Sequence, residues 1–245
     1  MDSSIPSVGA LTILAFGLML GVKHATEIDH VVAVSSIVSQ HRSIWRSARV
    51  GCLWGLGHTA SLLMIGIIVL IFKVAIPDEV SAWFEFLVAL MIVLLGMLAL
   101  FGAISTRRDM HYHRHNHLKK SHIHLHFSEN EFDKQNSRSL HSHRVSRVGL
   151  KPFIVGSIHG LAGSGALTLL ILPQYESAAV SLSYLLIFGF GSVGGMLLMS
   201  VIVGLPFALV SQRLMKTHYA LQLVASGASV VFGLWYAYHL SVGQP

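Results

Sequence analysis

The stretch KHATEIDH, residues 23 to 30, places five ionisable side chains between two apolar segments. Residues 8 to 22 before it carry no charge, and residues 31 to 38 after it are apolar or hydroxylic. Imidazole and carboxylate groups are ligands that suit nickel and cobalt, and also zinc and copper. Their combination here indicates a metal site in apolar surroundings.

Two further histidines lie inside apolar segments of their own, His58 in LWGLGHTASLL and His159 in VGSIHGLAGSGAL. Ionisable groups inside a membrane are costly and usually face a partner or a cavity. At about 1.5 Å per residue, His30, His58 and His159 lie roughly 12 to 15 Å from one boundary, and His24 about 24 Å. A shared depth favours one metal site over three separate core histidines bonded to neighbouring groups.

The KHATEIDH segment cannot aim all its ligands at one ion from a regular helix. At about 100° per residue, Glu27 shares a stripe with two histidines and Asp29 points away from it. Either the helix is irregular at its start, or one carboxylate orients a ligating imidazole instead of binding the ion. The predicted metal ligands are His24, Asp29, His30, His58 and His159, with Glu27 as the orienting carboxylate, although Glu27 and Asp29 can exchange these roles.

We do not expect the other ionisable or sulfur-containing residues of the apolar segments to bind the ion. Glu85 in WFEF lies near the end of a span, where we expect it to reach the interface. Met196 and Met199 are expected to pack rather than to bind metal. The single Cys52 excludes an intrachain disulfide framework and a cysteine-cluster metal site.

The composition indicates the elements that must position these residues. The chain has 245 residues, of which 53% are hydrophobic and 11% charged, and its mean hydropathy is +0.64. Soluble domains carry about 25% charged residues. Apolar blocks long enough to cross a membrane, about 20 residues each, recur after the first segment. They lie at 51–74, 82–104, 152–172, 181–210 and 221–240 and predict an all-α polytopic transmembrane helix bundle.

The charges of the loops predict a topology. Residues 7 to 40 are too long for one upright span, so we expect two helices broken near Gly21–His24. Segments 41–49, 105–151 and 211–218 are basic, whereas 73–80 and 172–179 are not, which places the first three in the cytoplasm. This gives about seven helices with the N-terminus inside and the C-terminus outside. A merged first span gives six helices and an external N-terminus instead.

Two further features concern the ends of the chain and its halves. A secretory signal peptide is disfavoured, because no Lys or Arg precedes the first apolar block and charged residues follow it. GVKHA and GSIHG would lie in the leading helices of two halves with opposite orientations, which suggests an inverted repeat. The expected organisation is N-terminal transmembrane helices at 1–104, a His-rich cytoplasmic loop at 105–150 and C-terminal transmembrane helices at 151–245.

The loop at 105–150 is rich in histidine and poor in aliphatic residues, and we expect it to lack regular structure. Clustered imidazoles bind transition metals transiently. The alternative is a polar linker in which the histidines are incidental. The expected low-affinity metal-binding residues are His111, His113, His115, His117, His122, His124 and His126.

The motifs resemble those of the nickel/cobalt transporter family. HATEIDH fits the family's H-x4-D-H signature, and LGHTASLL is similar to its second motif. Lys23 and Glu27 stand where the family usually has Arg and Asp. HGLAGSGAL is more similar to the urease-accessory membrane relatives of that family, and FGFGSVGGM lacks the carboxylate of the typical importers. The resemblance implies a multi-pass protein of the cell membrane that transports Ni²⁺ or Co²⁺ and needs no other cofactor.

Composition and resemblance together predict a permease for divalent transition-metal ions, working in uptake, with efflux as the alternative. Expected partners are the metal ion, the lipid bilayer and a cytoplasmic metallochaperone or a urease or hydrogenase maturation system. Nucleic acid is not expected, because the net charge of +6 comes from short loops that orient membrane proteins. An intramembrane protease is disfavoured, because H-E-x-x-H is absent and Ala162 replaces a glycine of G-x-S-G. We therefore expect no enzymatic activity; a metal-sensing membrane protein remains a further alternative.

Overall fold

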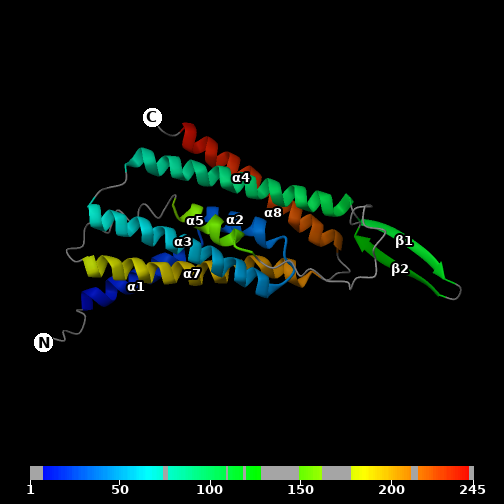
Figure 1. The fold of residues 1–245 in the computed structure, drawn as a ribbon, viewed down its shortest axis with the longest axis horizontal. Coiled ribbons are helices and arrows are strands. Elements are labelled where there is room, and N and C mark those ends of the chain that lie inside the picture. The colour runs from blue at the N-terminus through cyan, green and yellow to red at the C-terminus, as the bar shows by residue number, and fades with distance from the viewer. Residues whose placement is uncertain are drawn as a thin grey trace, which may run out of the picture.

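The computed structural model describes residues 8–73, 77–108, 110–117, 120–127, 149–161, 178–210 and 215–242. These residues form seven helices and one two-stranded sheet (Figure 1). The helices are α1 (Val8–His24), α2 (Ile28–Val38), α3 (Ile44–Phe72), α4 (Asp78–Arg108), α5 (Lys151–Gly160), α7 (Ala178–Leu209) and α8 (Met215–Val242). The strands are β1 (Met110–His117) and β2 (Lys120–Phe127). The predicted helix bundle is confirmed.

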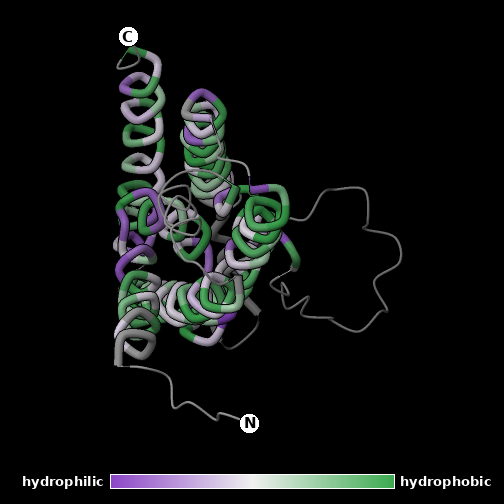
Figure 2. Tube along the Cα trace, turned by 90° about the vertical axis from the view of Figure 1, so that its left-hand side faces the viewer, coloured by the Kyte–Doolittle hydropathy of each residue, from purple (hydrophilic) through white to green (hydrophobic). Residues whose placement is uncertain are grey.

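Four of the helices, α3, α4, α7 and α8, are long and apolar enough to cross a membrane. Apolar residues dominate the helices in Figure 2, where hydrophilic positions occur in short stretches. Large apolar side chains such as Ile71, Phe190 and Leu209 lie exposed on the outside of the bundle. A continuous apolar surface of this kind marks contact with lipid.

Helices α1 and α2 follow one another along the same neighbour, α7. In α1, Gly17 packs against Tyr184 and Gly21 against Phe188, near the beginning of α7. At the end of α2, Val38 packs against Gly204, near the end of α7. The two helices, of 17 and 11 residues, therefore run parallel to α7 as two parts of one crossing.

The second half of the chain repeats this packing in the opposite direction. A Cβ atom on Gly21 of α1 would collide with the carbonyl oxygen of Phe188 in α7. Likewise, a Cβ atom on Gly156 of α5 would collide with the carbonyl oxygen of Trp54 in α3. Each half thus packs its leading helix, through a glycine, on the second helix of the other half.

The central helix pairs show the same two-fold relation. Gly55 of α3 packs on Val193 of α7, and Gly189 of α7 packs on Thr59 of α3. In the outer pair, Gly96 of α4 packs on Val230 of α8, and Gly233 of α8 packs on Val93 of α4. Both pairs are antiparallel. The expected inverted repeat therefore relates α1–α2, α3 and α4 to α5, α7 and α8, with related helices running in opposite directions.

This arrangement changes the predicted topology at the N-terminus. Because α1 and α2 run in the same direction, the start of α1 lies at the opposite end of the bundle from the hairpin, as Figure 1 shows. The seven predicted helices are present, but α1 and α2 form one broken crossing in place of two successive antiparallel spans, as in the six-span alternative. The side of the membrane that the N-terminus faces stays a prediction. The physical reason is the short α2, which at about 1.5 Å per residue reaches only part of the way across a membrane.

The His-rich loop also departs from the prediction, because part of it is regular. Strands β1 and β2 pair antiparallel, with His111 opposite His126, His113 opposite His124 and His115 opposite His122. Histidine occupies every second position of these segments, and this period of two is the pattern of a strand. The loop histidines' side chains and residues 128–148 lie outside what the structure describes.

We predict that the N-terminus and residue 78 face one side of the membrane and the hairpin loop faces the other. Single cysteines placed by Ser4→Cys, Asp78→Cys and Asn130→Cys in a Cys52→Ser background test this with a membrane-impermeant thiol reagent. The first two should label from outside the cell, and the third only after permeabilisation, as the basic loops predict. Labelling of positions 4 and 130 from the same side would contradict the single crossing formed by α1 and α2.

Candidate metal centre

The site is built at the break between α1 and α2. Helix α1 ends at His24 and α2 begins at Ile28, with residue 27 in an extended conformation. The hydroxyl of Thr26 donates a hydrogen bond of 2.6 Å to the carbonyl oxygen of Lys23, which holds the turn closed. The break was predicted near Gly21–His24, and the structure has it just afterwards, at residues 25–27. It lets two successive helix ends direct their side chains to one point, which a regular helix could not do.

Four buried imidazoles meet at this point from three parts of the chain. The ring of His30 on α2 lies 4.5 Å from that of His24, 5.2 Å from that of His58 on α3 and 4.1 Å from that of His159 on α5. No more than 4% of any of the four residues is exposed. The imidazoles therefore form one cluster in the interior of the bundle.

One pair of ring nitrogens has the spacing of two ligands on one ion. Nε2 of His24 lies 3.0 Å from Nε2 of His58. Two nitrogens that each bind a metal at about 2.0 to 2.1 Å lie roughly 3 Å apart when they occupy adjacent coordination positions. The ligand atoms of His24, His30 and His58 all lie within 4.8 Å of one another. This triad is the best-formed candidate for the metal site.

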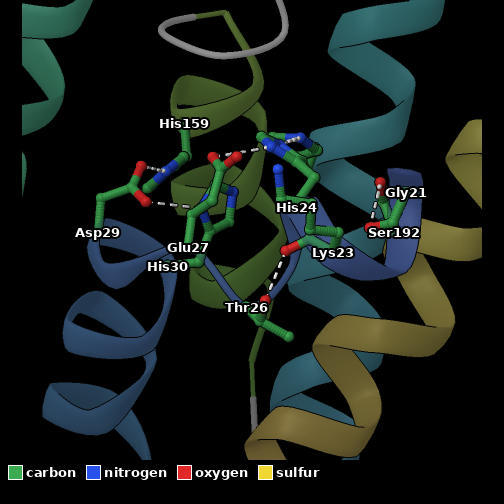
Figure 3. A network of polar contacts seen from close by, with 10 residues as sticks. Gly21, Lys23, His24, Thr26, Glu27, Asp29, His30, His159 and Ser192 are labelled. Carbon is green, nitrogen blue, oxygen red and sulfur yellow. Dashed lines mark hydrogen bonds and ion pairs between the residues drawn. The ribbon is translucent and has the colours of Figure 1, made fainter. Parts of the chain in front are cut away.

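The carboxylate of Asp29 holds two of the imidazoles. Its Oδ1 lies 3.0 Å from Nδ1 of His30, and its Oδ2 lies 2.9 Å from Nε2 of His159 (Figure 3). With neutral imidazoles, both rings donate their N–H to this carboxylate, which fixes their tautomers. Asp29 also belongs, with these two histidines, to a second group of potential ligands. The same residue can therefore orient imidazoles or bind an ion.

Glu27 holds a third imidazole in the same way. Its Oε2 lies 3.0 Å from Nδ1 of His24, on the far side of the ring from His58. The other ring nitrogen of His24, Nε2, is the atom that contacts His58. The predicted orienting role of Glu27 thus fits the geometry, and Asp29 acts similarly towards its two neighbours.

Three further ring nitrogens of the cluster are buried in a way that favours the binding of an ion. Nε2 of His30, Nδ1 of His58 and Nδ1 of His159 are buried and have no hydrogen-bond partner among the described residues. A buried polar atom without a partner is unfavourable by roughly 1 to 3 kcal/mol. An ion bound in the triad removes this penalty for Nε2 of His30, because Asp29 holds the other nitrogen of that ring. Two carboxylates with neutral imidazoles also give a charge of −2, which a divalent cation balances.

Aromatic and small residues enclose the cluster. The ring of Trp54 lies 5.6 Å from that of His159, and the ring of Phe188 lies 5.6 Å from that of His24. Ser61 of α3 donates a hydrogen bond of 2.7 Å to the carbonyl oxygen of Ser157, which fixes α5 next to α3. Sequence reasoning did not include Trp54 and Phe188 in the site, although both lie one turn from a glycine of a close helix contact.

The sequence-predicted residues His24, Glu27, Asp29, His30, His58 and His159 are all brought together. Two other residues, Met196 and Glu85, were predicted to lie outside the site. Met196 is buried in the apolar core, where packing was expected. Glu85, which was expected to reach the interface near the end of a span, is half-buried in the first third of α4. Its position four residues before the fully buried Ala89 indicates an inward direction, because residues i and i+4 share a helix face.

Comparison with known proteins gives relatives along nearly the whole chain. The urease accessory protein UreH of Bacillus sp. (strain TB-90) is 39% identical over 237 residues, which cover 97% of this chain and 95% of the relative. The Arabidopsis thaliana chloroplast protein FOR GROWTH AND FERTILITY 1 is 24% identical, over 92% of this chain and 59% of its own length. FOR GROWTH AND FERTILITY 2 of the same plant is 25% identical, over 72% and 42%.

Other comparisons add nothing to this assignment. No family model matches the chain, and no solved structure is similar to it. The assignment therefore rests on the bacterial relative, whose similarity spans both halves of the bundle and includes the segments that build the histidine cluster. By this near full-length similarity, the chain belongs to the family of the urease accessory protein UreH.

Proposed function

We propose that this protein is a membrane permease for a divalent transition-metal ion, with nickel or cobalt as the cargo. The observation that carries the proposal is the cluster of four buried imidazoles and one carboxylate at a break in a crossing helix. Unwound backbone and helix ends at the interior of a bundle are where secondary transporters bind their substrates. The chain supplies nitrogen and oxygen ligands that suit nickel and cobalt.

The family assignment and the motifs support this cargo. The relative's name, urease accessory protein, makes urease maturation the recipient that we propose for the ion. The H-x4-D-H motif contributes His24, Asp29 and His30 to the cluster, and the second motif contributes His58. The two motifs that carry the resemblance to nickel/cobalt transporters therefore meet in space.

The distribution of charge supports uptake rather than efflux. The acidic Glu85 lies towards the beginning of α4, on the side of the bundle away from the basic loops. Asp29 and Glu27 are the more accessible members of the cluster, with 21% and 37% of their side chains exposed, whereas the histidines are buried. Carboxylates on the external approach raise the local concentration of cations. We therefore propose that the ion enters past Glu85.

A metal-sensing role, with the bundle as an anchor for the loop, is the second candidate. It requires the loop histidines to dominate function. The buried cluster argues against it, because an anchor needs no convergent ionisable groups at its centre, where each is unfavourable without a partner.

We predict that His30→Ala and His58→Ala each abolish accumulation of nickel and cobalt. Each change removes an imidazole from the triad and leaves the other ligands without a complete site. Uptake of radiolabelled metal by expressing cells, compared at equal amounts of inserted protein, measures the effect. His239→Ala is the matched control, because His239 is exposed on α8 and should leave uptake unchanged. Uptake at the parent rate by both triad variants would place the site elsewhere.

We predict that the His-rich loop tunes transport without creating it. The hairpin extends beyond the end of the helices in Figure 1, so it cannot form a path through the bundle. Deletion of residues 111–143 should leave measurable flux and change mainly its dependence on metal concentration. The measurement is metal uptake over a range of concentrations with membrane insertion verified. Complete loss of flux by an inserted deletion variant would show that the loop belongs to the pathway.

A further inference from the structure

Helix α8 carries a row of four polar residues, three of them buried, along the side of α2 that leads away from the histidine cluster. His218, Gln222, Ser226 and Ser229 fall within about 80° of the helix circumference at 100° per residue. The two serines are fully buried and His218 is 4% exposed, whereas Val224, Val231 and Trp235 on the same helix are exposed. We call these four residues the α8 polar row.

The α8 polar row lies against polar groups of α2. The hydroxyl of Ser36 donates a hydrogen bond of 2.7 Å to that of Ser229, which is itself 3.1 Å from the carbonyl oxygen of Val32. At the end of α2, Gln222 donates a hydrogen bond of 2.8 Å to the carbonyl oxygen of Ser39. Oxygen atoms therefore line the α2–α8 interface from about two turns after His30 to the end of the helix.

Hydrogen bonding between α2 and α8 does not explain two members of the α8 polar row. The hydroxyl of Ser226 and Nδ1 of His218 are buried and have no hydrogen-bond partner among the described residues. Helix packing alone favours small residues, and hydroxyls that serve as glue are bonded across the interface. A buried hydroxyl and imidazole without such bonds are instead available to a ligand.

The inverted repeat provides an internal comparison. The reciprocal contacts between Gly96 and Val230, and between Gly233 and Val93, set α4 and α8 in register. In this register Ala89 corresponds to Ser226 and Ile92 to Ser229. Both α4 residues are fully buried. The same packing position is therefore filled by apolar side chains in one half, so packing does not require the hydroxyls of α8.

We propose that the α8 polar row is the inner route by which a divalent cation leaves the histidine cluster; this inference rests on the proposed function. The route is closed in this structure, because His218, Ser226 and Ser229 are buried. When α2 and α8 separate, hydroxyl and carbonyl oxygens exchange their mutual hydrogen bonds for water and the ion. Weak oxygen ligands suit release, because an ion must bind well enough to enter and loosely enough to leave.

The test compares Ser226→Val with Ser226→Thr, two side chains of similar size that differ in a methyl group and a hydroxyl group. The purified full-length variants are assayed for Ni²⁺ binding in detergent and for Ni²⁺ flux into liposomes that contain a metal-sensitive dye. Ser226→Val should lower flux by about tenfold with unchanged binding, because a dehydrated ion loses a polar partner. Ser226→Thr should retain the parent flux.

The outcomes distinguish failure of the inner route from failure of the proposed function. Parent flux in both variants would overturn the inner route, and so would equal loss in both, since the hydroxyl would then make no difference. Loss of binding by Ser226→Val would also overturn it and assign Ser226 to the histidine site. An unaltered protein that binds Ni²⁺ but gives no flux would instead contradict the proposed function.

Discussion

The carboxylate of Asp29 joins the two halves of the bundle at the centre of the histidine cluster. One oxygen contacts His30 in its own half, and the other contacts His159 in the second half. Both imidazoles are buried, so the loss of this carboxylate would leave two ring nitrogens without a partner. The glycine contacts at Gly21 and Gly156 bring the helix backbones close enough for this bridge to form. The histidine cluster and the inverted repeat therefore depend on the same short set of contacts.

The two halves are similar in backbone and different in chemistry. In the first half, the residues that follow His24 supply Glu27, Asp29 and His30; in the second half, HGLAGSG follows from His159 without an ionisable residue. The corresponding faces of α4 and α8 differ as well, because one becomes apolar after Glu85 and the other carries hydroxyls. A pair of inverted halves can thus provide an acidic approach on one side and a hydroxyl-lined release route on the other.

Much of the candidate site could be predicted from the sequence because charged and imidazole groups in apolar segments have few explanations. His24, Asp29, His30, His58 and His159 were identified in this way. The path of α1 and α2 could not be predicted, because an apolar stretch of that length is compatible with two spans or with one broken crossing. The start of α3 at Ile44 could not be read from its apolar block, because the helix begins several residues earlier in a polar, basic segment. The half-buried position of Glu85 could not be predicted, because it depends on the packing of α4 against its neighbours.

X-ray absorption at the nickel edge tests whether the buried imidazoles bind the transported ion. The sample is the purified protein without residues 111–143, loaded with one equivalent of Ni²⁺, beside the same protein with His58→Ala. We expect nitrogen and oxygen ligands only, at about 2.0 to 2.1 Å, with scattering from several imidazoles that weakens in the variant. A spectrum without imidazole scattering, or one that His58→Ala leaves unchanged, would contradict this expectation.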